Sequence, residues 1–214
     1  PRGSQDVDVN ANFDWTYTVS GNDDGWLGIE RTDKGFTFTP SVNHGESTRK
    51  VTITVTTGDG KENVATTVVT VSQAGIDLGA FIVGLNVAKV KNAIPASSVP
   101  VTEIEAVTID WGDGSEPEEI AAGGKPSHTY TDEGYYVVSV KGSAAALSTS
   151  SLSSEQKTQI DEVYNWGRLG LTSMESAFEN CDSLKTVPAD NSGAFENVTS
   201  FDKAFYNCKV LKEI

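Results

Sequence analysis

The stretch TIDWGDGSEPEEIAAGGKPSHTYTDEGYYVVSVKG, residues 108–142, decides the fold of the middle of this chain. It begins with a pattern in which Val107, Ile109 and Trp111 alternate with polar residues, which predicts a half-buried strand. A turn follows, because its glycines accept positive φ angles and Asp113 can hydrogen-bond the backbone two residues on. A second alternating pattern ends the stretch, so it predicts two strands joined by a turn and a polar loop.

Three phrases within this stretch carry a family resemblance. They are IDWGDG at residues 109–114, HTY at 128–130 and GYYVVSV at 134–140. Together they resemble a PKD-type domain. The resemblance implies a seven-stranded, immunoglobulin-like β-sandwich of a surface protein, with no chemistry of its own and a structural hydrogen-bonding role for His128.

Residues 7–75 predict an all-β segment. Val51, Ile53 and Val55 alternate with threonines, and a turn at residues 57–60 leads into a returning strand, which is a hairpin pattern. The phrases WLGI (26–29), FTP (38–40), VTITV (51–55) and VSQAG (71–75) resemble a BACON domain. That family has another strand before this point, so its first strand is expected to be missing or truncated here. An unpaired sheet edge is a template for association.

The C-terminal part contains a repeat. Residues 171–187 align with 198–214 at an offset of 27, with 8 of 17 positions identical. The shared phrase AFxNCxxL resembles the leucine-rich repeats of BspA-like bacterial surface proteins, and such a period predicts a solenoid. Equivalent residues are then expected to stack in one apolar core, namely Phe178 with Phe205, Leu184 with Leu211 and Met174 with Phe201.

The sequence as a whole predicts a mainly β protein: two immunoglobulin-like β-sandwiches in tandem, then a short leucine-rich-repeat (α/β solenoid) segment. Residues 1–4 match the tail of an engineered protease site and are left out of the fold. The expected domains are a BACON-like sandwich at 5–76, a PKD-like sandwich at 77–142, and a cap with leucine-rich repeats at 143–214. A short helix, capped near Ser154 and running to about Trp166, is expected in that cap.

The charge of the chain excludes some partners. It has 16 Lys and Arg against 30 Asp and Glu, a net charge of −14 that is spread along its length. No segment offers a basic face, so nucleic acid and anionic membrane surfaces are poor partners. No apolar run reaches the ~18 residues of a membrane-spanning helix, so no membrane insertion of this region is expected.

Acidic residues gather around the turn at Asp113. Asp110, Asp113 and Glu116 are the candidate metal ligands, because hard carboxylate oxygens at close spacing could hold Ca²⁺; Glu118 and Glu119 lie beside them. EF-hand spacing is absent, however, and the turn alone explains Asp113. Both interpretations stay open at this stage, and no other cofactor is indicated.

Catalysis is not expected. His44 and His128 are the two histidines, and neither has a nucleophile at a recognisable motif spacing. Cys181 and Cys208 fall at equivalent repeat positions, where buried free thiols are expected, although a disulfide between stacked repeats is geometrically conceivable.

Aromatic rings are candidates for sugar contacts, because a flat ring stacks on the apolar face of a sugar. Trp15 and Trp111 alternate with polar residues as core positions do. Trp26 and Tyr206 are less constrained and are the candidate ligand-binding residues.

The BACON-like, PKD-like and BspA-like resemblances together imply a non-catalytic, secreted or cell-surface adhesion protein of a gut bacterium, at the extracellular or outer-membrane surface. Such a protein is expected to bind a glycan or a host protein. Two alternatives remain: a structural stalk that carries a binding region elsewhere, and a phage appendage module. An exposed pair of aromatic rings would favour binding over a stalk.

Overall fold

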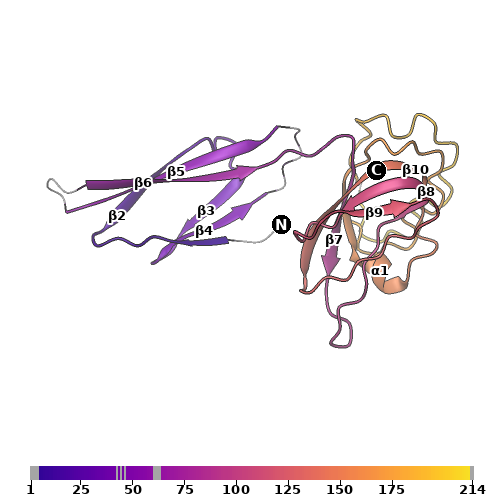
Figure 1. Ribbon diagram of the computed structural model, residues 1–214, viewed down its shortest axis with the longest axis horizontal. Helices are drawn as coiled ribbons and strands as arrows, with labels where there is room; N and C mark the ends of the chain where they lie inside the picture. Colours follow the sequence, from indigo (N-terminus) through magenta and orange to yellow (C-terminus); the bar gives the residue numbers. More distant parts are fainter. Residues whose placement is uncertain (1–4, 42, 44, 46, 60–63, 213–214) are drawn as a thin grey trace. The chain divides into compact units, whose positions relative to one another are not determined.

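The computed structural model describes residues 5–41, 43, 45, 47–59 and 64–212, so residues 1–4 and His44 lie outside the description. The described chain is mainly β, with strands β1 to β11 and the short helix α1. It divides into two compact units, an N-terminal unit that ends at Ile76 and a C-terminal unit from Asp77 to Ile214 (Figure 1). The division falls where the sequence placed the end of the first domain.

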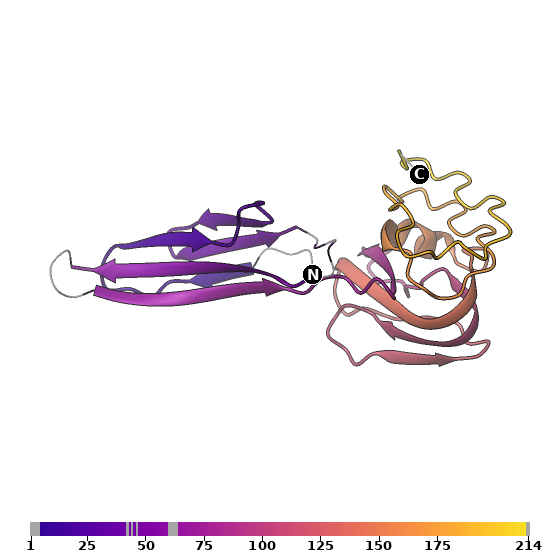
Figure 2. The same cartoon turned by 90° about the horizontal axis from the view of Figure 1, so that it is seen from above.

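The N-terminal unit contains two antiparallel three-stranded sheets, which face each other as two layers (Figures 1 and 2). One sheet has the order β1 (Gln5–Asp8), β4 (Gly35–Pro40), β3 (Leu27–Arg31). The other has the order β2 (Trp15–Ser20), β5 (Arg49–Gly58), β6 (Val64–Gln73). The four-residue β1 occupies the edge at which the sequence suggested a missing or truncated strand.

The core of the N-terminal unit follows from the alternation seen in the sequence. Val51, Ile53 and Val55 of β5 are buried, whereas the threonines between them point to the other face. Phe36 and Phe38 of β4 meet these residues from the opposite sheet. The strand periodicity therefore decides which face of each sheet is covered.

The C-terminal unit is built on one antiparallel five-stranded sheet with the order β11-β7-β10-β8-β9. Its strands are β7 (Phe81–Val87), β8 (Val101–Asp110), β9 (Glu118–Ala121), β10 (Gly134–Leu147) and β11 (Ile160–Asn165). A register shift between Ser143 and Ala144 bends the fourteen-residue β10. Residues 108–142 supply the last three residues of β8, all of β9 and the first nine residues of β10.

The expected boundary between residues 142 and 143 is wrong, because it falls inside β10. Residues on both sides of it pair with β8, from Val140 with Ile109 to Leu147 with Val101. One hydrophobic core extends from Phe81 to Ala204. Residues 77–142 and 143–214 therefore form one unit, because the sheet and the repeat region share the same buried side chains.

The helix is shorter than expected. α1 spans Ser154–Gln159, and Ser153 caps it in a reciprocal capping box with Gln156. At Ile160 the chain becomes β11 instead of continuing as a helix to Trp166. Pairing with β7 buries Ile160 and Val163, and this tertiary contact overrides the local helical pattern.

The two repeats stack on the end of β10. The Thr172 amide donates to the Ala145 carbonyl (2.8 Å), and one layer further the Phe178 amide donates to the Ala204 carbonyl (2.8 Å). Isolated parallel bridges join Ala146 to Ser173 and Ser173 to Ser200. The sheet thus supplies the layer beneath the first repeat, which explains how two copies bury a core.

Stacking between equivalent residues holds in the interior and fails at the surface. The rings of Phe178 and Phe205 are parallel within 3°, with centroids 5.7 Å apart, so that expectation is confirmed. Leu184 is buried and Leu211 packs against the same core. Met174 is buried but Phe201 is 48% exposed, so the expected continuation of the core through Phe201 is wrong.

Candidate ligand-binding site

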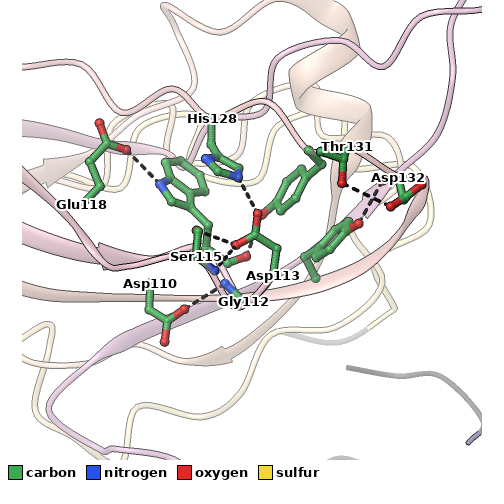
Figure 3. Close-up of polar contacts among 11 residues, drawn as sticks. Asp110, Gly112, Asp113, Ser115, Glu118, His128, Thr131 and Asp132 are labelled. Atoms are coloured by element: carbon green, nitrogen blue, oxygen red, sulfur yellow. Dashed lines mark hydrogen bonds and ion pairs between the residues drawn. The ribbon is translucent and has the colours of Figure 1, made fainter.

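The turn around Asp113 is a closed network of hydrogen bonds (Figure 3). Asp113 Oδ1 accepts from the Ser115 amide (3.0 Å) and hydroxyl (2.6 Å), while Oδ2 lies 2.8 Å from Nε2 of His128. The Ser115 hydroxyl contributes most to holding the pKa of Asp113 at about 2, below its ordinary value of 3.8. Asp110 Oδ1 accepts from the Gly112 amide at 2.9 Å, which closes the start of the turn.

Aromatic side chains fix this network to the sheet. The indole of Trp111 stacks on His128, with ring centroids 5.0 Å apart, and donates through Nε1 to Glu118 at 2.9 Å. The Tyr130 hydroxyl donates to the Trp111 carbonyl at 2.8 Å, and burial raises the pKa of Tyr130. His128 thus has the structural role that the family resemblance implied.

The structure does not assemble the calcium site considered from the sequence. In the described part of the chain, no three His, Cys, Asp or Glu side chains gather as metal ligands. Oxygens of Asp110 and Asp113 accept hydrogen bonds within the turn, and Glu116 does not join them as a third ligand.

No helix in the described residues is long and apolar enough to cross a membrane.

Both cysteines are free thiols within the stacked repeats. Cys181 is fully buried, and burial raises its pKa to about 12. Cys208 is half-buried, and its thiol donates to the Phe178 carbonyl at 3.1 Å. Beside them, the Asn207 amide donates to Asn180 Oδ1 at 2.8 Å, which links the two repeats. Both thiols therefore pack within the repeats, Cys181 more deeply than Cys208.

Trp26 and Tyr206, the two candidate ligand-binding aromatic residues, differ in their exposure to solvent. Trp26 is only 4% exposed and lies under the guanidinium of Arg49, 4.5 Å from the ring centroid, so the prediction of an exposed contact is wrong there. Arg49 is held in place by Gln73 and Ser41. Tyr206 is 62% exposed and stays a candidate, whereas Trp15 and Trp111 are buried as expected.

Phe13 in the N-terminal unit lines a hollow that was not predicted from the sequence. Phe13 lies in the loop between β1 and β2, and its side chain is 50% exposed. An open hollow of about 790 Å³ and a second of about 400 Å³ adjoin this ring and share Ala11, Asn12 and Phe13 in their linings. The larger one is lined by Val9, Ala11, Asn12, Phe13, Asp14, Trp15, Arg31, Thr32 and Asp33.

The loop that carries Phe13 is tied to its surroundings. The Thr57 hydroxyl lies within hydrogen-bond distance of the carbonyls of Phe13 (3.1 Å) and Asp14 (3.2 Å). Arg31 lies over the Trp15 ring at 4.0 Å and donates to the Trp15 carbonyl at 3.1 Å. Thr57 of β5 therefore fixes the loop that carries the exposed ring, and the contact between Arg31 of β3 and Trp15 of β2 fixes two further lining residues.

The lining can recognise a polyhydroxylated ligand. The exposed ring of Phe13 offers an apolar surface to the C–H face of a sugar. The exposed Asp14 and Asp33 carboxylates accept hydrogen bonds from hydroxyl groups, and Asn12 can donate and accept. Two carboxylates against one guanidinium, which already contacts Trp15, disfavour an anionic ligand.

A sequence signal for this site was present. Phe13 stands among the loop-forming residues of the phrase NANFD, outside the strand alternation, where no core contact requires an aromatic ring.

Comparison of the chain with family models, curated proteins and solved structures gives no match.

Proposed function

We propose that this chain is a non-catalytic binding protein that recognises a neutral glycan through the hollow at Phe13. The observation that carries the proposal is the half-exposed Phe13 ring, flanked by carboxylate and amide side chains on a loop fixed by Thr57. Affinity would come from stacking of the ring, and orientation from hydrogen bonds to Asp14, Asp33 and Asn12.

Two features of the hollow support an extended ligand. Its two parts are both lined by Phe13, so a chain of sugar units could cross the ring and enter both. Both parts are open, which suits the middle of a polysaccharide rather than a small molecule enclosed in a pocket.

The resemblance to BACON, PKD-type and BspA-like repeat modules supports an extracellular or outer-membrane location in a gut bacterium and a role in adhesion. A host glycoprotein would present the same sugar chemistry as a free polysaccharide. The stalk alternative predicts no sugar binding by this chain.

The test is a glycan array that contains neutral, sialylated and sulfated oligosaccharides, followed by calorimetric titration with each neutral oligosaccharide that binds. Phe13→Ala should weaken binding at least tenfold, since the ring supplies the main apolar contact. Phe13→Tyr should keep the binding, because it keeps the ring. Asp33→Asn should weaken it less than loss of the ring.

Tyr206→Ala is the matched control, because it removes another exposed ring from the other unit. It should leave affinity unchanged. Loss of binding in Tyr206→Ala but not in Phe13→Ala would move the glycan site to the repeats. Absence of binding to every neutral glycan, or a preference for sialylated or sulfated glycans, would refute the proposal.

A further inference from the structure

Strand β6 presents an unusually long uncharged edge. It stands last in its sheet and pairs with β5 in unbroken register, from Val64 opposite Gly58 to Gln73 opposite Arg49. Its ten residues, VATTVVTVSQ, include no charged residue, proline or glycine. Natural edge strands avoid pairing with other chains through charges, proline, bulges or short length, and β6 has none of these.

The other described sheet edges carry such protection. The four-residue β1 contains Asp6 and Asp8. The edge strands β3, β9 and β11 each contain charged residues. The remaining edge, β2, is uncharged but has only six residues, and Asp14 precedes it directly.

The side chains of β6 are also uncovered. Val64 is 63% exposed and Val68 is 58% exposed, on the face of the sheet that points away from the core. Ala65, Thr66 and Thr67 are exposed on both faces, so no described element covers this end of the strand. An uncharged and accessible edge is therefore available to a further strand.

We propose that β6 pairs with β6 of a second copy of this chain, antiparallel and about a two-fold axis at Val68. Directly opposed residues must lie on the same face of a sheet, which the axis at Val68 satisfies. It places Val68 opposite Val68 of the partner subunit, Thr66 opposite Thr70 and Val64 opposite Ser72. The pairing joins two three-stranded sheets into one six-stranded sheet along about 30 Å of shared edge.

Charge favours a second copy as the occupant. The chain has a net charge of −14, so most contacts between two copies bring acidic surfaces together. The β6 edge avoids this repulsion, because only Arg49 and Lys50 of the adjacent β5 carry charge, at one end of the strand. Val68 meeting itself is an apolar contact, and antiparallel pairing matches amides with carbonyls on both copies.

Sedimentation velocity across a range of micromolar concentrations tests the proposal. The wild type should approach 45.6 kDa, twice the 22.8 kDa of one chain. Val68→Lys should return the mass to 22.8 kDa, because two ammonium groups would then face each other at the axis. Val68 is exposed, so the variant should keep the circular dichroism spectrum of the wild type.

Thr18→Lys is the matched control. Thr18, Thr54 and Val68 form one row across the sheet, so this change puts the same charge on the opposite edge. It should leave the dimer intact. An equimolar mixture of Val68→Lys and Val68→Glu should restore the dimer, since opposite charges then meet at the axis.

Amide hydrogen exchange gives a second readout: residues 64–72 should exchange more slowly in the wild type than in Val68→Lys. A monomeric wild type at all concentrations overturns the proposal. A Val68→Lys dimer, or loss of the dimer in Thr18→Lys as well, places the contact elsewhere and equally overturns it. Failure of the mixed charge variants to pair rejects the axis at Val68.

Discussion

Phe178→Ala tests whether the sheet and the repeats of the C-terminal unit share one core. The ring is fully buried, stacked on Phe205 at 5.7 Å and edge-on to Trp166 at 6.0 Å. Removing a buried phenylalanine costs about 3–5 kcal/mol, because the apolar contacts are lost and a cavity remains. In a unit of this size that corresponds to a fall in melting temperature of roughly 10–20 °C.

The assay is calorimetry combined with limited proteolysis. Because one core extends from Phe81 to Ala204, the variant should lose residues 77–214 together, while the N-terminal unit keeps its own melting transition and survives as a fragment. Phe201→Ala is the matched control: it is the same change in the next repeat, but at a 48% exposed side chain, and should cost less than about 1 kcal/mol. A stable fragment that ends near residue 142 would refute the shared core.

Three further predictions concern the turn at Asp113 and the thiols. The folded pKa of Asp113 is about 2 against an ordinary 3.8, so its contribution to stability is present above pH ~4 and is lost as the pH falls toward 2. Asp113→Asn should therefore make the free energy of unfolding, measured with urea, depend less on pH over this range. An unchanged pH dependence in the variant would contradict the assignment. Gly112→Ala should lower the free energy of unfolding by more than about 1 kcal/mol, because Gly112 has φ +76° and a Cβ would lie 2.4 Å from the Val137 carbonyl oxygen. Gly114→Ala, with φ +85° and open space around it, should cost less, and equal losses would show that the close approach is unimportant. In native protein at pH 8, maleimide should label Cys208 before Cys181, because the Cys181 thiol is buried with a pKa of about 12. Mass spectrometry of the labelled peptides reports the order of labelling. Equal labelling rates would mean that the repeat core opens readily.

The sequence determined the local structure of this protein. Alternation of apolar residues in β5 and around Trp111 predicted strands and their buried faces, because side chains on a strand alternate between its two faces. The 27-residue offset predicted the stacking of Phe178 on Phe205, since equal spacing puts both rings at the same point of successive layers. Turn chemistry predicted that Asp113 would bond its own backbone.

Tertiary structure alone decided how these pieces share their cores and surfaces. Residues 143–147 continue β10 and pair with β8, and residues 160–165 become a strand on β7, which no local pattern specifies. Trp26 is covered by Arg49, 23 positions away in sequence, whereas Phe13 stays exposed in a loop held by Thr57. Exposure and pairing depend on which distant segment covers a residue, and periodicity reports only the face on which that residue lies.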